Sequence, residues 1–221
     1  MKLISIDAAR TSWIFPLTEL NPTGRSFTEA FADLATRYSF KKFPKHTLDV
    51  DSDKALTFEG GEFTNRDGEQ IIIKLRVYTD GCVVDCWSST RDAEDFLKDA
   101  MKWLKTEHGF GLPADTPIRT IYLSELTVRT NKSLISLNSK LHAFTDALSD
   151  KVKEFGGKDT GFNFGSIGFW SNDTKRPMAP GPFRFENKVG TLPKDQRYFS
   201  QAPLPTDAHL ALLDKLEAIL D

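Results

Sequence analysis

Side chains suited to metal or redox chemistry are scarce in this sequence. Its 221 residues include two cysteines, Cys82 and Cys86, and four histidines. The cysteines do not have C-x-x-C spacing, and no two histidines have H-x-x-x-H spacing. A structural zinc site needs about four ligands, usually at such spacings. We therefore expect no metal site and no bound cofactor.

Long apolar runs are also missing. No stretch approaches the roughly 20 apolar residues of a membrane-spanning helix, and residues 1–7 lack the apolar core of a signal peptide. Along an extended strand Cys82 and Cys86 would lie about 13 Å apart, whereas a disulfide needs Cα atoms within about 7 Å. Two free thiols are typical of a reducing compartment. We expect a cytoplasmic protein that makes no membrane contact.

An excess of basic residues, the usual mark of a protein that binds a nucleic-acid backbone, is absent as well. The chain carries 29 basic and 31 acidic residues, for a formal net charge of −2. Nucleic acid is therefore the less favoured partner, although the total does not test for a local basic patch. Gly60-Gly61 and Gly156-Gly157 lack the spacing of phosphate-binding loops, and there is no G-x-S-x-G motif. No motif requires a reaction, so we favour a protein that is not an enzyme.

What the sequence does contain is a strong β pattern over residues 55–88. Its alternating core positions include Ile71, Ile73, Leu75 and Val77. This period of two predicts a strand with one core face. Turn sequences flank that strand, with Asn-Arg-Asp-Gly at 65–68 and Asp-Gly at 80–81. The pattern predicts an antiparallel β-meander, with Ser89 or Thr90 capping the helix that follows.

Apolar residues at three- and four-residue spacing predict about four helices. They cover approximately residues 26–38, 90–108, 133–155 and 206–220. Ser26 and Glu29 have the spacing of a capping box at the start of the first helix. The apolar stripe of the 133–155 helix has near-heptad spacing. That spacing fits either a helix–helix dimer seam or a helix packed on its own sheet, and we favour the sheet.

Together these elements predict an α+β fold, with one or two antiparallel β-meander sheets and about four helices packed on one face. Strand, polar cap and helix follow one another at residues 82–104 and again at 197–220, which suggests an internal β–α pseudo-repeat. No segment has the composition of a disordered linker. We therefore expect residues 1–221 to form a single compact domain, and the place for any sub-boundary is near residues 110–117.

Most acidic residues in the central section have a local structural explanation. Asp80 lies in a turn, and Asp92, Glu94 and Asp95 lie where acidic side chains stabilise the start of a helix. Asp85 has no such explanation, because apolar residues flank it within its strand. We expect Asp85 to lie either on the solvent-facing side of the sheet or in the core as a buried carboxylate.

The segment after Trp170 has the features of a binding surface. Residues 171–182 read Ser-Asn-Asp-Thr-Lys-Arg-Pro-Met-Ala-Pro-Gly-Pro. Long loops often carry binding, and Trp and Arg are common interface anchors. We therefore take Trp170, Asn172, Lys175 and Arg176 as the candidate binding residues. The alternative is that the aromatic side chains at this position belong to the core.

The hypothesis we prefer is a non-enzymatic interaction or assembly protein. It would bind a protein partner or form a homo-oligomer through sheet edges and the 171–182 loop. Its context would be that of an accessory protein of a bacterial operon, a mobile element or a phage-defence system. The alternative is a nucleotide- or nucleic-acid-handling enzyme or binder that uses carboxylates near Asp85 with Lys175 and Arg176.

Overall fold

The computed structural model describes residues 1–22, 24–44, 55–137, 140–155, 161–172, 180–191 and 195–220. Its helices and strands are those of an α+β protein, which confirms the predicted fold class. In chain order they are β1 (Lys2–Ile14), α1 (Leu17–Leu20), α2 (Thr28–Arg37), β2 (Leu56–Thr64), β3 (Gln70–Tyr78), β4 (Gly81–Cys86), α3 (Thr90–His108), β5 (Arg119–Arg129), the 3-10 helix η2 (Leu134–Leu137), α4 (Lys140–Glu154), β6 (Ser166–Phe169), β7 (Phe183–Asn187), β8 (Arg197–Ala202) and α5 (Thr206–Ile219).

Within these described residues the strands form an eight-stranded antiparallel sheet in the order β2-β3-β4-β1-β5-β8-β7-β6. The order is symmetric about the boundary between β1 and β5. The chain correspondingly runs β1-α1-α2-β2-β3-β4-α3 and then β5-η2-α4-β6-β7-β8-α5. Each series contains a strand, a short helical turn, a helix, a three-stranded meander and a final helix. The strand–cap–helix order seen in the sequence is therefore the end of a longer repeat.

The chain packs as two compact units, which we describe separately. Unit 1 contains Met1–Ser5, Leu126–Ala202 and Asp207–Asp221, and unit 2 contains Ile6–Glu125 and Pro203–Thr206. The strands β1 and β5 contribute residues to both units. The single-domain organisation expected from the sequence stays a prediction.

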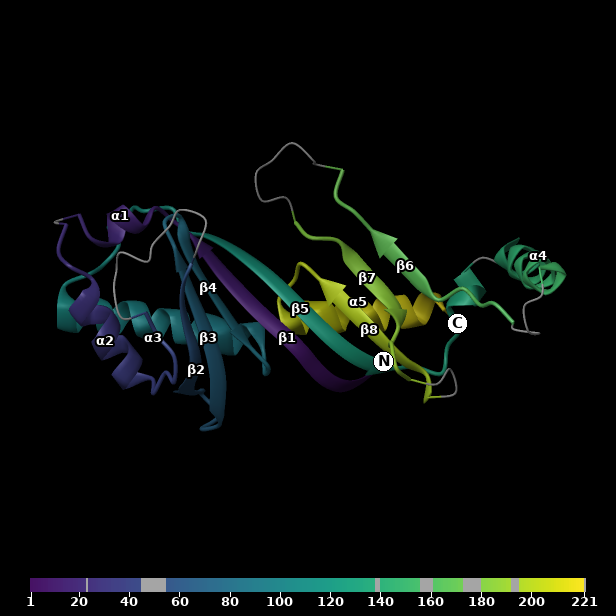
Figure 1. Cartoon of the computed structure of the whole chain (residues 1–221), viewed down its shortest axis with the longest axis horizontal. Helices are drawn as coiled ribbons and strands as arrows, with labels where there is room; N and C mark the ends of the chain where they lie inside the picture. Colours follow the sequence, from purple (N-terminus) through teal and green to yellow (C-terminus); the bar gives the residue numbers. More distant parts are fainter. Residues whose placement is uncertain are drawn as a thin grey trace. The chain divides into compact units, whose positions relative to one another are not determined.

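Unit 2 is built around the predicted meander. The residues Ile71, Ile73, Leu75 and Val77 of β3 are buried, as their alternation predicts. They face α2 and α3, which Figure 1 shows on one side of β2, β3 and β4. The helices contribute Phe31 and Phe96 to this core, and Phe58 of β2 packs edge-on against Phe31 with ring centroids 5.6 Å apart. Rigid aromatic rings therefore fill much of the space between the sheet and the helices.

The turns of the meander follow the predicted chemistry. The Asn65 side chain accepts hydrogen bonds from the backbone N–H groups of Asp67 (3.0 Å) and Glu69 (2.9 Å). Gly81 begins β4 with φ of 147°, and a Cβ there would lie 2.1 Å from the carbonyl oxygen of Trp13. Only glycine fits such a close approach of two backbones. The turn sequence thus sets the register of β4 against β1 as well as against β3.

One predicted helix cap is confirmed and another is wrong. Ser89 caps α3, and its hydroxyl accepts from the N–H of Asp92 at 3.1 Å. The expected capping box of Ser26 and Glu29 does not form, because α2 begins one residue later, after Phe27, which has helical backbone angles. The Ser26 hydroxyl instead accepts from the N–H of Thr28 at 3.3 Å.

The starts of α3 and α5 exchange hydrogen bonds through two buried threonines. The N–H of Thr90 donates to Thr206 Oγ1 at 3.1 Å, and the N–H of Thr206 donates to Thr90 Oγ1 at 2.9 Å. The two hydroxyls lie 3.3 Å apart. Thr11 of β1 donates its hydroxyl to the carbonyl of Thr90 at 2.9 Å. The first N–H groups of a helix have no partner within the helix. Here each threonine hydroxyl accepts a hydrogen bond from the first N–H group of the other helix.

Unit 1 uses a buried histidine to join its last helix to its sheet. The Ser200 hydroxyl of β8 donates to the carbonyl of Arg184 at 3.0 Å and lies 2.8 Å from His209 Nε2. Because the hydroxyl proton is already donated, Nε2 is the donor to Ser200 Oγ. His209 and Leu213 of α5 are fully buried, and α5 lies behind β8 and β7 in Figure 1.

The predicted 133–155 helix differs from the structure in two respects. It is divided into η2 and α4, with the described helical residues of α4 beginning at Lys140. We expected its apolar stripe to pack on the sheet, but Thr145 is the one buried residue of α4, and Phe144 is 66% exposed. Helical spacing of apolar residues predicts an apolar face, yet it does not say whether the same chain covers that face.

Replacing Thr90 or Thr206 by valine should destabilise the protein. Valine keeps the shape of threonine but leaves a buried N–H group without its acceptor, which costs about 1–3 kcal/mol. The double variant should lose less than the sum of the two single variants, by roughly the 0.5–1.5 kcal/mol of the shared hydroxyl–hydroxyl bond. Urea unfolding of the four proteins measures this coupling. Thr106→Val, at an exposed site of α3, is the control. Additive losses would contradict the hydroxyl–hydroxyl bond, and unchanged stability of both single variants would contradict the exchange.

His209 should make the stability depend on pH. Burial lowers the pKa of His209 to about 4, whereas an unfolded histidine has a pKa of about 6.5. The folded protein therefore favours neutral His209, and its stabilising effect is complete above pH of about 6.5 and decreases as the pH falls toward 4. Urea unfolding across this range should show a smaller decrease for His209→Gln than for the wild type. Parallel curves would show that His209 is not responsible.

Candidate functional site

Asp85 lies on the face of unit 2 opposite α2 and α3, which we call the helix-free face. Arg10 of β1 and Lys74 of β3 are its direct neighbours across the two adjacent ladders. Arg10 Nε donates to Asp85 Oδ1 at 2.6 Å, and Arg76 Nη2 donates to Asp85 Oδ2. The Asp85 side chain is only 16% exposed. Of the two positions expected for Asp85, the structure shows the side of the sheet that faces away from the core packed by α2 and α3.

Both carboxylate oxygens of Asp85 are thus engaged by arginines of the neighbouring strands. Arg76 Nε is buried and has no hydrogen-bond partner among the described residues. A second pair lies beside this group, because Lys74 Nζ donates to Glu59 Oε1 at 2.7 Å, and this bond lowers the pKa of Glu59. Cross-strand ion pairs of this kind stabilise a sheet surface. They leave Asp85 poorly placed to hold a metal ion.

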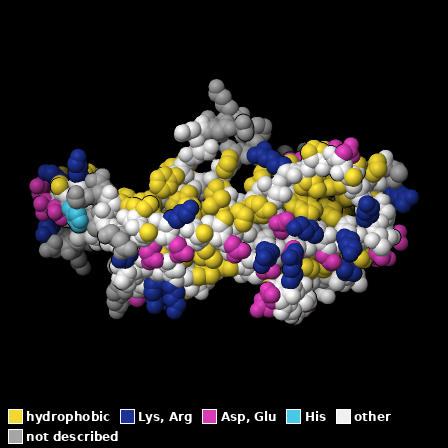
Figure 2. Space-filling model, turned by 180° about the vertical axis from the view of Figure 1, so that it is seen from behind, with side chains coloured by type: hydrophobic (Ala, Val, Ile, Leu, Met, Phe, Trp, Pro, Cys, Tyr) yellow, Lys and Arg dark blue, Asp and Glu magenta, His cyan; other side chains and the backbone are white. Residues whose placement is uncertain are grey.

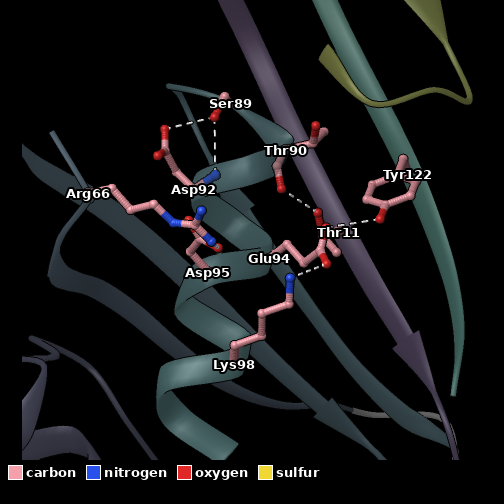
Figure 3. A network of polar contacts seen from close by, with 9 residues as sticks. All are labelled: Thr11, Arg66, Ser89, Thr90, Asp92, Glu94, Asp95, Lys98 and Tyr122. Carbon is pink, nitrogen blue, oxygen red and sulfur yellow. Dashed lines mark hydrogen bonds and ion pairs between the residues drawn. The ribbon is translucent and has the colours of Figure 1, made fainter. Parts of the chain in front are cut away.

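The carboxylates at the start of α3 are also partnered (Figure 3). Asp92 accepts from the Ser89 hydroxyl at 2.9 Å. Asp95 Oδ1 lies 2.5 Å from Arg66 Nη2. Glu94 pairs with Lys98 at 2.6 Å and accepts from the Tyr122 hydroxyl at 3.0 Å. The helix-start role predicted for the three acidic residues fits Asp92, which lies in the first turn of α3. Glu94 and Asp95 instead pair with side chains around the helix.

The protonation of Glu94 follows from its partners. Partial burial opposes ionisation, but the hydrogen bonds from Lys98 and Tyr122 outweigh it and lower the pKa of Glu94. Burial and the bond to Glu94 raise the pKa of Tyr122. Across the described residues no group of three or more His, Cys, Asp or Glu side chains is arranged to hold a metal ion. The carboxylates of Asp92, Glu94 and Asp95 therefore act as capping and ion-pair partners.

The two thiols are buried on the core face of β4. Cys82 and Cys86 are free, and burial raises the pKa of Cys82 to about 12 and also raises that of Cys86. Cys86 Sγ lies 3.2 Å from the carbonyl of Ser89 and 3.5 Å from the Ser88 hydroxyl. A reactive cysteine needs a lowered pKa and access to solvent, so these thiols are suited to packing.

The candidate binding residues from the sequence are only partly described by the structure. Trp170 follows β6 and is 68% exposed, and the neighbouring Asn172 is exposed too. The Trp170 ring lies over Gly168, where an added Cβ would come within 2.8 Å of it. Lys175 and Arg176 lie outside the described residues. Whether the four residues act together stays a prediction.

Two further exposed surfaces were not found from the sequence. The apolar stripe of α4 exposes Phe144 and Leu148. Trp87, which directly follows β4, is 57% exposed. Sequence spacing identified the α4 stripe but assigned it to the core. Trp87 gave no signal, because the burial of a single aromatic residue at a strand end cannot be read from its neighbours.

Charged side chains of both signs are mixed on the surface shown in Figure 2. Basic and acidic groups alternate there among hydrophobic side chains, without a broad area of one sign. A surface that tracks a nucleic-acid backbone would present a basic stripe. The face drawn in Figure 2 does not have the electrostatic character of such a surface.

The comparisons with known proteins give no family. A scan against protein-family models finds no match, and a search of curated proteins finds none either. Among the described residues, no helix combines the length and apolar character needed to cross a membrane.

Removing the charge of Asp85 should destabilise the protein. In Asp85→Asn the guanidinium groups of Arg10 and Arg76 would lose their shared anion, at a cost of about 1–3 kcal/mol. Adding Arg76→Met to this variant should recover part of the loss, because one of the two unpaired cations is removed. Urea unfolding tests both, with Asp115→Asn at an exposed turn as the control. Equal stability of Asp85→Asn and the wild type would contradict the ion-pair role.

Proposed function

We propose that this chain is a non-enzymatic interaction or assembly protein, which binds a protein partner or a second copy of itself mainly through unit 1. The observation that carries the proposal is the uncovered apolar face of α4. The helix has 15 residues, and Thr145 alone is buried. Helices of about 12–15 residues are marginal in water without packing, so covering this face would stabilise both the helix and a complex.

The repeated element order strengthens this interpretation. α2 and α4 occupy the same position in the two series, each after a long strand and a short helical turn. In unit 2, α2 buries Ala30, Phe31 and Leu34 against the core. In unit 1, α4 leaves Phe144 and Leu148 at the surface. Phe144 and Leu148 are therefore available to a partner in a way that Phe31 and Leu34 are not.

The end of β6 offers a second apolar contact in unit 1. Phe169 and Trp170 are both more than half exposed. Large aromatic residues, together with arginine, contribute most of the binding energy of many interfaces. We include Asn172, Lys175 and Arg176 in this proposed contact, where the two cations would pair with acidic groups of the partner.

The outer edge of β2 is less suited to self-association. Lys42 and Glu59 already exchange backbone hydrogen bonds across it, at 3.2 and 2.8 Å. Between Phe58 and Gly61 the register shifts, with Gly60 at φ of 68°. A bulge of this kind twists an edge strand and hinders pairing with another chain. The proposal therefore rests on α4 and the end of β6 rather than on this edge.

The enzymatic alternative draws little support from the geometry. Asp85 is engaged by two arginines, and the carboxylates of α3 have their own partners. Both thiols are buried and protonated at neutral pH. The pairing of these groups favours a binding role. We further propose a cytoplasmic location and an accessory role in a bacterial operon, mobile element or phage-defence system.

A double substitution on α4 tests the proposal. Phe144→Ser with Leu148→Ser should weaken association at least about tenfold, because an interface loses apolar anchors worth more than about 1.4 kcal/mol. The monomer should keep nearly its full stability, since both side chains are already exposed. Light scattering after size exclusion measures self-association, and affinity purification of the full chain from its native host identifies a partner.

The matched control is Ile219→Ser on α5. Ile219 is 67% exposed, against 66% for Phe144, so it controls for a general loss of surface hydrophobicity. Trp170→Ser tests the end of β6 separately. A strict monomer that purifies with no partner would contradict the proposal, and so would a complex that the α4 variant forms as well as the wild type does.

A further inference from the structure

A cavity of about 610 Å³, open to solvent and with exposed carboxylates at its rim, lies between α2 and the C-terminal end of α3 in unit 2. Figure 1 shows these two helices lying side by side. The volume is in the range of small-ligand sites, roughly 300–1,000 Å³. The side chains that give this cavity its chemistry are Glu29, Asp33, Trp103, Glu107, His108 and Phe110.

The charges around the cavity favour a cation. Glu29 and Asp33 come from adjacent turns of α2, and Glu107 comes from the last turn of α3. One basic residue, Arg25, also lines the cavity, so the formal charge stays negative. The last carbonyl groups of α3 point toward its C-terminal end, where the helix dipole is negative and attracts a cation further. Carboxylates and helix dipole therefore act in the same direction.

Aromatic rings form the wall of the same cavity. The Trp103 and His108 rings meet edge to face with centroids 5.1 Å apart, and the His108 ring is nearly parallel to that of Phe110 at 6.2 Å. The Trp103 ring already makes a cation–π contact with one guanidinium group, because the guanidinium carbon of Arg37 lies 5.4 Å from its ring centroid. Guanidinium groups bind to aromatic faces by cation–π attraction and stacking.

One buried polar atom at the cavity makes no hydrogen bond with the described residues. This atom is His108 Nε2. Asp33 Oδ2 is 3.4 Å away, which is too long for a strong hydrogen bond. Asp33 and His108 Nε2 therefore lie close enough together for one ligand with several polar hydrogens to contact both.

We propose that this cavity binds a guanidinium group. A guanidinium is planar, keeps its charge, carries five N–H donors and is weakly hydrated. These properties match three carboxylates beside aromatic rings better than those of a compact ammonium ion. The group would belong either to an arginine side chain of a polypeptide or to a small guanidine compound. This site lies in unit 2, so it goes beyond the proposed function of α4 and does not depend on it.

Calorimetric titration of the full chain tests the site with three probes. These are N-acetyl-arginine amide, the neutral isostere N-acetyl-citrulline amide, and a capped Gly-Arg-Gly peptide. Asp33→Asn should weaken binding of the arginine probes by about tenfold or more, as expected when one charge-assisted hydrogen bond is lost. Asp146→Asn, an exposed acidic site on α4, is the control. Because bound ligand stabilises the folded state, the arginine probes should also raise the Tm of the wild type more than that of Asp33→Asn.

Each outcome decides the proposal. Binding of the arginine probes, without binding of the citrulline probe, supports the site if Asp33→Asn weakens it and Asp146→Asn does not. Binding of the peptide alone also supports the site and assigns the guanidinium to a polypeptide. Absence of saturation up to about 10 mM overturns it, since such an affinity is too weak for a built site. Equal binding of arginine and citrulline, or binding unchanged in Asp33→Asn, overturns it as well.

Discussion

The reciprocal bonds between Thr90 and Thr206 fix where two helices begin. Each hydroxyl supplies the acceptor that the first turn of the other helix lacks, and both side chains are almost fully buried. The start of α3 determines which residues of its 19-residue length face the sheet. It also places the carboxylates of the first turns beside Arg66 and Tyr122, and Gly109 in a left-handed conformation then ends the helix. The packing of α3 in the core and the ion pairs of its first turns depend on this alignment.

The polar groups of unit 2 largely satisfy one another. Asp85 and the carboxylates of α3 lie within strands and helices that are rigidly packed, and most of their oxygens already accept bonds from basic or hydroxyl groups. A catalytic carboxylate must instead be free to reach a substrate or a metal ion. The role we propose instead is recognition, through apolar side chains of α4 that the described residues leave exposed and through an acidic cavity with aromatic walls.

Features set by neighbouring residues could be predicted from the sequence, and features set by distant residues could not. The β3 alternation, the Asn65 turn and the Ser89 cap depend on a few adjacent positions, so local patterns located them correctly. The partners of Asp85 are Arg10, which is 75 positions away in the sequence, and Arg76 of the neighbouring strand β3. No local pattern revealed them. The cavity beside His108 likewise needs α2 and α3 to be brought together.

The candidate binding surface shows the same division. The sequence located Trp170 as an aromatic residue next to a polar segment, but its exposure depends on how β6 ends. The stripe of α4 was recognised as apolar and then assigned to the sheet, because packing inside the same chain is the commoner outcome. What covers an amphipathic helix is a property of the whole assembly, and a single sequence does not contain it.

The matching element orders of the two series place α2 and α4 at the same point in each series but in different surroundings. The two helices should therefore evolve under different selective constraints. Substitutions at Phe31 of α2 are limited by the interior that surrounds it, and its side chain should stay large and apolar in related proteins. Phe144 of α4 has no such interior around it. Its identity should therefore covary with the surface of the molecule that it contacts.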